Sequence, residues 1–391
     1  MSSLGRESDE RTPLIPPESS NSTAKLLQFL DRPKAKIIIG FSFFAVLILA
    51  GGLTVLFTTI WGSDPILSAS EIQTCAWSEL ESDLWLLDVP RIEWSEFLTR
   101  QATLAATLRK EGIDAYIMEP SASSLYYFNI STSYSLSERP FLTIISSDGS
   151  FSLLAPSFEV GRVGGLNMVY DEMRIIEWKE EESPYNVLRQ EIGNGTTKVM
   201  VDEQTRFFIT SGLQAANFTV LPVSSAISSI RTVKSQAELR ILRGINQFTA
   251  KVIRALQPCI KVGITQEALF NAAYSIFEHA GVGLGFWAVV LFGEQAANPH
   301  GGSKGKLLGN SEFVLIDIGS TLHGYGSDVT RTILPEDESI SQELLDAWYL
   351  VLSAQEAAIS TTGEEIPCSV VDAASRYAYP SYHLPLPLKD F

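Results

Sequence analysis

Two aspartates carry the strongest chemical signal in this sequence. Asp317 and Asp328 lie eleven residues apart in FVLIDIGSTLHGYGSDVTRT, and Asp317 follows an apolar segment typical of a strand. A hairpin centred between Leu322 and His323 would place the two carboxylates opposite each other on one face. Because desolvation and like charge both penalise two ionised carboxylates, such a pair must share a proton or a cation. The second interpretation predicts a metal site, and the alternative is an acidic surface hairpin.

Length and composition limit the classes of function. The chain has 391 residues, of which 45% are hydrophobic, so it can form packed cores in two domains besides any membrane anchor. Its formal net charge of -16, without a basic run that could neutralise phosphates, argues against a nucleic-acid partner.

Residues 37–60 contain no charged side chain, and this length is sufficient to span a bilayer. A buried core helix is seldom this long and uncharged, and a cleaved signal peptide has a shorter apolar core nearer the terminus. Lys and Arg precede the segment, whereas 62–90 contains neither, which predicts a cytosolic N-terminus. We therefore expect a single-pass type II anchor in the lipid bilayer, with the folded region lumenal or extracellular.

The N-terminal tail contains a candidate sorting signal. Glu10, Leu14 and Ile15 lie in ERTPLI, which resembles the acidic dileucine signal of vacuolar and lysosomal membrane proteins. The alternative is a random hexapeptide in a disordered tail. We expect a vacuolar or lysosomal membrane, with the cell surface as the other possibility.

Sequons and cysteines are compatible with this topology. Three Asn-X-Ser/Thr triplets are glycosylation candidates, at Asn129, Asn194 and Asn217. Three cysteines permit one disulfide and leave one thiol over: Cys75, Cys259 and Cys368.

Helix and strand patterns alternate after residue 90. The first region is predicted to form an α/β domain. Its expected elements are a helix closed by Gly112, a strand, a hairpin around Asp148-Gly149 and a further strand: Ser95–Lys110, Asp114–Met118, Phe141–Ser146 with Phe151–Ala155, and Lys198–Val201. In the second region, a capping box of Ser235 and Glu238 begins a helix that ends near Leu256, and Thr265 begins another that ends at Gly281. Two strands are expected after it, at Trp287–Phe292 and Phe313–Ile318.

Residues 230–335 resemble the N-terminal half of the "pita-bread" catalytic domain of the aminopeptidase P, prolidase and creatinase family. The resemblance rests on RTVKS with Glu238, GEQAANPHG at 293–301, Asp317-Ile318-Gly319, and GYGSDVTRT at 324–332. It implies that Asp317 and Asp328 bind a dinuclear centre, manganese most often, with cobalt or zinc possible. It also implies that His300 lines the substrate pocket and contacts the scissile carbonyl, the alternative being an ordinary loop histidine. No role is implied for His279 or His323, which we expect in a helix and a turn.

The upstream α/β domain favours the proline-directed members of this family, because residues 113–116 and 124–128 resemble its opening strand and turn. The resemblance implies release of the N-terminal residue from Xaa-Pro peptides, with prolidase-like cleavage of Xaa-Pro dipeptides as the closest competitor. Paired metal ions can activate water and polarise the scissile carbonyl. A homodimer is possible.

The sequence departs from the family pattern at its C-terminal end. Family members complete the metal site with a histidine in a Gly-His-Gly setting and two glutamates, and these have no counterpart here. Residues 371–376 resemble the helix before that histidine, whereas His383 lies in an unrelated tail and is not a ligand candidate. We expect a poor enzyme or none, and a truncation by splicing or gene prediction. The alternatives are a membrane-anchored pseudoenzyme that binds peptides and a metal-free hydrolase.

The expected fold is thus an α/β creatinase-like domain followed by an incomplete α+β pita-bread domain, preceded by one transmembrane helix. The expected divisions are a disordered cytosolic tail at 1–36, the anchor at 37–60, an acidic stalk at 61–90, the α/β domain at 91–229, the partial catalytic domain at 230–376 and a non-homologous tail at 377–391.

Overall fold

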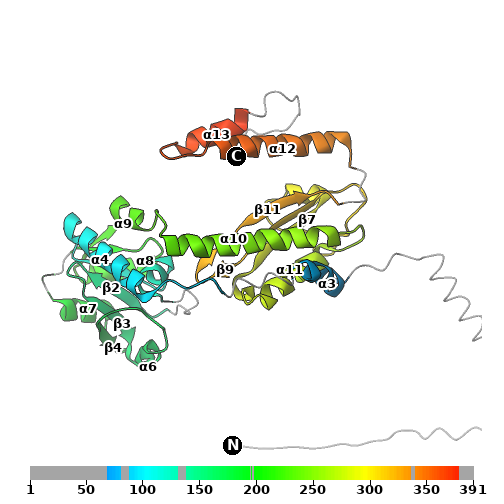
Figure 1. Ribbon diagram of the computed structural model, residues 1–391. Coiled ribbons are helices and arrows are strands. Elements are labelled where there is room, and N and C mark those ends of the chain that lie inside the picture. Colours follow the sequence, from blue (N-terminus) through cyan, green and yellow to red (C-terminus); the bar gives the residue numbers. More distant parts are fainter. Residues whose placement is uncertain are drawn as a thin grey trace, which may run out of the picture. The chain divides into compact units, whose positions relative to one another are not determined.

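The computed structural model describes residues 68–80, 88–130, 138–193, 195, 198–335 and 340–377 (Figure 1). The expected anchor at 37–60, the sorting signal at 10–15 and His383 lie outside these ranges. Within them, no helix combines the length and the hydrophobicity needed to cross a bilayer.

The first domain is built on a six-stranded mixed sheet with the strand order β4-β3-β2-β1-β5-β6. β1 and β3 pair with β2 in antiparallel fashion, and the remaining neighbours are parallel. The strands are β1 (Ala115–Met118), β2 (Leu142–Ser146), β3 (Phe151–Pro156), β4 (Met173–Trp178), β5 (Lys198–Val201) and β6 (Thr219–Pro222). The predicted strands and the hairpin at Asp148-Gly149 are confirmed.

Helices cover both faces of this sheet. Side chains alternate along β1, so that Tyr116 and Met118 enter one core whereas Ala115 and Ile117 enter another. The first core includes residues of α4 (Trp94–Glu111), α5 (Ala122–Phe128), α6 (Val160–Val163) and α9 (Ser225–Ile230), and the second those of α7 (Pro184–Ile192) and α8 (Phe207–Ala215). As predicted, α4 ends at Gly112, whose φ of 66° places it in the left-handed region.

The second domain packs two helices against one face of an antiparallel sheet with the order β11-β8-β7. Its elements are α10 (Gln236–Leu256), α11 (Gln266–His279), β7 (Trp287–Phe292), β8 (Val314–Gly319) and β11 (Val329–Ile333). The predicted caps are confirmed. Ser235 and Glu238 form a reciprocal capping box, and the Thr265 side chain accepts a hydrogen bond from the backbone N–H of Ala268. Two short strands, β9 (Thr321–Leu322) and β10 (Tyr325–Gly326), lie between β8 and β11.

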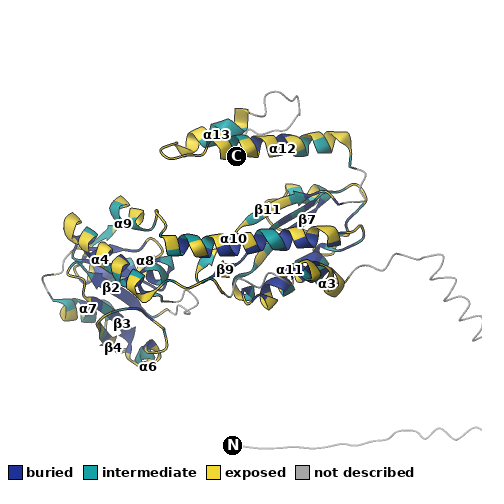
Figure 2. Ribbon diagram, viewed as in Figure 1, coloured by how far each residue is buried: buried dark blue, intermediate teal, exposed yellow. Residues whose placement is uncertain are grey.

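Strand β8 separates a buried face from an accessible one. Val314, Ile316 and Ile318 are fully buried in the core that α10 and α11 complete, whereas Leu315 and Asp317 on the other face are only half-buried. Figure 2 shows the same division along α10, which is dark blue on one side and yellow on the other. One face of the sheet therefore stabilises the domain and leaves the other for polar groups.

The interval expected to be an acidic stalk contains a packed helix. Helix α3 (Ala69–Leu80) buries Ile72, Ala76 and Leu80 in the core of the second domain, and Cys75 forms a disulfide with Cys259. The stalk prediction therefore needs correction for this stretch, because apolar residues spaced by four form one face of a helix. The expectation of one disulfide and one remaining thiol is confirmed, and Cys368 is free and exposed.

Two C-terminal helices, α12 (Gln342–Thr361) and α13 (Cys368–Tyr377), pack against each other. Trp348 of α12 donates a hydrogen bond to the Thr332 carbonyl at 3.0 Å and stacks on Phe313. These contacts tie α12 to β11 and to the start of β8. The helix predicted at 371–376 is confirmed as part of α13. Short 3-10 turns complete the fold: η2 (Ser157–Glu159), η3 (Gln257–Cys259), η4 (Gly283–Gly285) and η5 (Gly293–Ala297).

Candidate metal centre

The hairpin that carries the two aspartates differs in register from the sequence prediction. Thr330, and not Asp328, lies opposite Asp317 in the β8–β11 ladder, and Leu322 pairs with Tyr325. The turn is therefore centred between His323 and Gly324, whose φ angles are 51° and 87°. Two consecutive residues with positive φ are typical of a tight hairpin turn with glycine second. The predicted centre, between Leu322 and His323, was one residue too early.

Moving the turn centre by one residue changes the partner of Asp317 by two residues, from Asp328 to Thr330. Because side chains alternate with a period of two, both aspartates still lie on one face of the sheet. Burial, and then the charge of the neighbouring Asp317 carboxylate, raise the pKa of Asp328. Thr330 donates a hydrogen bond of 2.7 Å from its hydroxyl to the Asp317 carboxylate. The structure thus brings the two predicted ligands together on the accessible face of the sheet.

Buried hydroxyls fix the segment between β10 and β11, which contains Asp328. Ser327 Oγ is 2.7 Å from Thr249 Oγ1 on α10, and Ser320 donates its backbone N–H to Ser327 Oγ at 3.0 Å. Beside them, a Cβ atom on Gly319 would lie 2.0 Å from the Ser327 carbonyl oxygen, which is closer than any real contact. Gly319 therefore permits the close approach of the two strands next to the aspartate pair. Gly319 and Ser327 lie in the motifs that carry the family resemblance, whereas Thr249 and Ser320 had no signal in the sequence.

His300 is exposed on the loop that follows η5. Gln266, a buried residue at the start of α11, holds this loop. Its amide donates to the Ser303 carbonyl at 2.6 Å and to Gln295 at 3.2 Å, and its oxygen accepts the Phe292 N–H at 2.7 Å. These bonds fix the base of the loop on α11 and β7. Gln266 was missed in the sequence, where nothing distinguishes it from an exposed helical glutamine.

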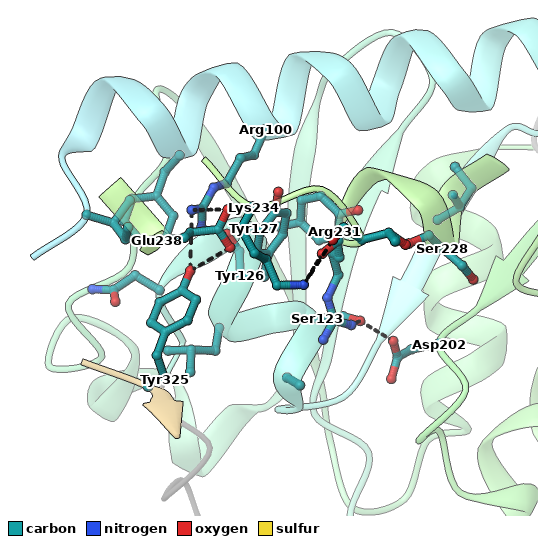
Figure 3. A pocket seen from close by; sticks show the side chains of 18 of the residues that line it. Arg100, Ser123, Tyr126, Tyr127, Asp202, Ser228, Arg231, Lys234, Glu238 and Tyr325 are labelled. Atoms are coloured by element: carbon teal, nitrogen blue, oxygen red, sulfur yellow. Dashed lines mark hydrogen bonds and ion pairs between the residues drawn. The ribbon is translucent and has the colours of Figure 1, made fainter. Parts of the chain in front are cut away.

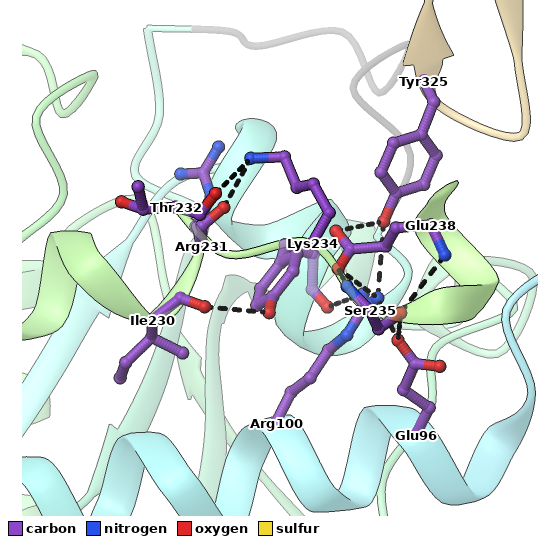
Figure 4. A network of polar contacts seen from close by, with 10 residues as sticks. Glu96, Arg100, Ile230, Arg231, Thr232, Lys234, Ser235, Glu238 and Tyr325 are labelled. Carbon is purple, nitrogen blue, oxygen red and sulfur yellow. Dashed lines mark hydrogen bonds and ion pairs between the residues drawn. The ribbon is translucent and has the colours of Figure 1, made fainter. Parts of the chain in front are cut away.

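A polar network connects the hairpin tip to the first domain (Figure 4). Tyr325 donates a hydrogen bond of 3.0 Å to Glu238, and Arg100 of α4 lies 3.7 Å from the same carboxylate. Arg100 also forms a 2.6 Å ion pair with Glu96, which accepts a 2.7 Å bond from the Ser235 hydroxyl. The N-terminal cap of α10 is therefore part of the contact between the two domains.

The remaining predicted residues occupy separate places. Asn217 is exposed, whereas the Asn129 side chain is half-buried and donates to the Asn167 carbonyl at 2.9 Å. Asn194 lies outside the described residues. His279 ends α11 and His323 lies in the hairpin turn, as expected. Burial lowers the pKa of His323.

The donor chemistry of the pair suits a hard divalent cation, since two carboxylates on one face supply oxygen ligands. In the part of the chain that the structure describes, no group of three or more His, Cys, Asp or Glu side chains is placed to hold a metal ion. The pair therefore fits one side of a metal site and does not complete it.

Comparison with known proteins agrees with this geometry. Residues 100–233 match the creatinase/prolidase N-terminal domain, and residues 240–384 match metallopeptidase family M24. The two matches follow each other along the chain in the order that the resemblance implied.

Among curated proteins, the chain is 42% identical over 297 residues to an uncharacterized peptidase of Schizosaccharomyces pombe, a match that covers 73% of this chain and 65% of the relative. It thus spans less than two thirds of that relative's length. An uncharacterized peptidase of Staphylococcus aureus is 28% identical over 289 residues, covering 71% of this chain and 78% of the relative.

Solved structures show the same fold. A prolidase from Thermococcus sibiricus matches with a TM-score of 0.63 and 23% identity, over 74% of this chain and 78% of its own. The dipeptidase PepE from Mycobacterium ulcerans matches with a TM-score of 0.65 and 20% identity, over 74% of this chain and 77% of its own. At these identities the likeness concerns the fold alone.

Proposed function

We propose that this chain has the design of a metal-dependent aminopeptidase that releases the N-terminal residue from Xaa-Pro peptides. The observation that carries the proposal is the placement of Asp317 and Asp328 on the accessible face of the hairpin, where the charge of Asp317 helps to raise the pKa of Asp328. Two adjacent carboxylates without a cationic side chain between them suit a divalent ion. The match to metallopeptidase family M24 supports hydrolysis of a peptide bond as the reaction. It also supports the metal, because M24 enzymes generally depend on two divalent metal ions.

In this proposal Asp317 and Asp328 hold the metal ions, with manganese favoured over cobalt and zinc. Such ions supply Lewis-acid polarisation of a carbonyl and lower the pKa of water. Thr330 orients the Asp317 carboxylate through its 2.7 Å hydrogen bond. His300 is proposed to contact the substrate carbonyl, which its exposed loop position permits.

Two carboxylates bind a divalent ion weakly, so the proposal includes low activity or none for this 391-residue chain. Because the described residues provide no third ligand near the pair, a membrane-anchored pseudoenzyme that binds proline-containing peptides is the second candidate. Prolidase-like cleavage of Xaa-Pro dipeptides is the third, favoured by the fold shared with the Thermococcus prolidase. A homodimer remains compatible with all three.

Metal analysis and peptide turnover separate these candidates. The purified chain would be assayed with manganese on a tripeptide and a dipeptide that share the same Xaa-Pro bond. The proposal expects weak manganese binding and, at saturating manganese, slow cleavage of the tripeptide, both lost in Asp328→Ala. Asp171→Ala is the matched control, since Asp171 is exposed in the first domain. Metal-dependent cleavage of the dipeptide alone would favour the prolidase candidate. Binding of peptide without turnover would favour the pseudoenzyme.

We also propose a type II membrane protein of the vacuolar or lysosomal membrane, anchored through residues 37–60. The Cys75–Cys259 disulfide supports placement of the folded region in an oxidising compartment. Imaging of a tagged protein in which Leu14 and Ile15 are replaced by alanine tests the sorting signal. Unchanged targeting would reject it.

A further inference from the structure

A cavity of about 660 Å³ lies between the first domain and the hairpin tip, apart from the aspartate pair. Figure 3 shows side chains that line it. Its walls include α5, α9, the segment that joins α9 to α10, and residues 321 and 323–326 of the hairpin. Its volume is in the range of small-molecule sites.

The buried carboxylates of this cavity already have partners. Asp202, which is 3% exposed, accepts hydrogen bonds from the hydroxyls of Tyr116, at 2.8 Å, and Ser123. Glu238, which is 2% exposed, accepts bonds from the Tyr325 hydroxyl and the Ser235 N–H and lies beside Arg100. Their negative charge is therefore stabilised by the protein itself.

Two cations that line the cavity, Arg231 and Lys234, have no carboxylate partner among the described residues. Arg231 donates one hydrogen bond, from Nη1 to Ser123 Oγ at 2.7 Å, and its guanidinium lies 5.8 Å from the Tyr126 ring centre. Lys234 donates to the carbonyls of Arg231 and Thr232, at 2.6 and 3.3 Å. Neither forms an ion pair within the described ranges of the chain. Arg231 and Lys234 therefore keep cationic groups that no direct ion pair neutralises, and such groups can bind an anion.

A buried hydroxyl on the same cavity also lacks a partner. Tyr127 is 1% exposed, and its hydroxyl accepts and donates no hydrogen bond among the described residues. Burial raises the pKa of this hydroxyl, so it remains a donor at neutral pH. Arg231 and Asp202 are close enough to influence it electrostatically. Unpaired buried polar groups in folded proteins are uncommon and often mark a place where a ligand or water binds.

We propose that this cavity binds a small organic anion, whose carboxylate or phosphate group contacts Arg231 and Lys234 and accepts a hydrogen bond from Tyr127. The apolar side chains of Val223 and Ile227 and the ring of Tyr126 provide surface for the rest of the ligand. Arg231 suits either group, because its planar guanidinium can donate two parallel hydrogen bonds.

The site is linked to the metal centre through one hairpin. Tyr325 and Gly326 line the cavity, and Asp328 follows two residues later. A ligand that orders the hairpin tip would therefore also restrict the segment between β10 and β11 that carries Asp328. The binding itself needs no metal ion, so it can be tested independently of the proposed peptidase activity.

The test is calorimetric titration of the full-length chain, in detergent and EDTA, with three aromatic probes. Hippurate presents a carboxylate, phenyl phosphate presents a phosphate, and hippuramide is the neutral counterpart of hippurate. We expect one anion to bind with one site per chain and hippuramide to bind at least about tenfold more weakly, as the loss of a charge-assisted hydrogen bond implies. Whichever anion binds more tightly identifies the group that the site prefers. Binding of hippuramide as tight as that of the preferred anion, or no binding of either anion at millimolar concentrations, would overturn the proposal.

Two variants locate the site. Arg231→Gln should weaken the preferred anion by about tenfold or more, whereas Arg109→Gln should leave it unchanged, because Arg109 lies outside the cavity and bonds the Ser147 carbonyl. Tyr127→Phe removes a hydroxyl that has no partner among the described residues, so the variant should melt no lower than the parent and still bind more weakly. If both cavity variants bind as tightly as Arg109→Gln, the anion does not bind in this cavity.

Discussion

The sheets of the two domains use the same alternation of side chains for different purposes. In β1, neighbouring residues such as Ile117 and Met118 are both fully buried, because helices cover both faces of the first sheet. In β8, Ile316 is fully buried, whereas Leu315 and Asp317 face the accessible side. A strand covered on both sides contributes stability with every residue. A strand covered on one side can present carboxylates to a ligand.

Core truncation should produce the largest difference between the two sheets. Ile117→Ala and Met118→Ala should each lower the free energy of unfolding by about 2–5 kcal/mol, because each leaves a cavity. Ile316→Ala should do the same, whereas Leu315→Ala should cost about 1 kcal/mol or less, because its side chain is not fully buried. Urea unfolding measures these changes. A loss for Leu315→Ala as large as for Ile316→Ala would contradict the assignment of an accessible face.

The disulfide is the next largest contribution, and it belongs to the second domain alone. Replacing Cys75 and Cys259 together by alanine should lower the free energy of unfolding by about 2–5 kcal/mol, since the crosslink closes a long loop between α3 and η3. Cys368→Ala is the control and should have no effect, because this thiol is free and exposed. Urea unfolding in the absence of reductant tests this. Equal stability of the double variant and the control would mean that α3 adds nothing to the core.

The smallest expected effect concerns the pH dependence that the aspartate pair causes. The pKa of Asp328 is raised in the folded chain, so the folded state binds this proton more tightly than the unfolded state. The stabilisation that this proton provides is fully present at pH values below the unfolded-state pKa of about 3.9. It is lost as the pH rises through the higher pKa of the folded state. Without metal, the parent should therefore lose stability relative to Asp328→Asn over this interval. The difference should be small because Asp328 is exposed to solvent.

Urea unfolding in EDTA at a series of pH values measures this difference, with Asp171→Asn as the exposed control. The difference in unfolding free energy between the parent and Asp328→Asn should widen as the pH rises. A difference that is constant with pH, or that narrows, would show that the two carboxylates do not interact in solution.

The sequence predicted most elements of both domains because their ends carry local signals. Three predicted helix ends agree with the structure. Gly112 ends α4, the capping box of Ser235 and Glu238 begins α10, and Thr265 begins α11. The hairpin register was misplaced by two residues, since the choice between neighbouring turn centres depends on which residues adopt positive φ. The prediction that both aspartates share one face survived, because a shift of two residues does not change the face.

Features made of distant segments were not predictable in the same way. The packing of α3 had a weak signal in the spacing of Ile72, Ala76 and Leu80, but its partner helices lie about two hundred residues later in the chain. The pairing of Cys75 with Cys259 depends on that packing. Likewise, the anion cavity combines Tyr127 with Arg231, and no local pattern relates two residues so far apart.

The account rests most directly on the ability of Asp317 and Asp328 to share a divalent ion. Titration of the full-length chain with manganese, followed by electron paramagnetic resonance of the free ion, measures this without requiring catalysis. We expect weak binding at one site per chain that disappears in Asp317→Asn and in Asp328→Asn and persists in Asp171→Asn. Manganese binding of equal strength in all four proteins, or no binding at millimolar concentrations, would contradict the metal centre.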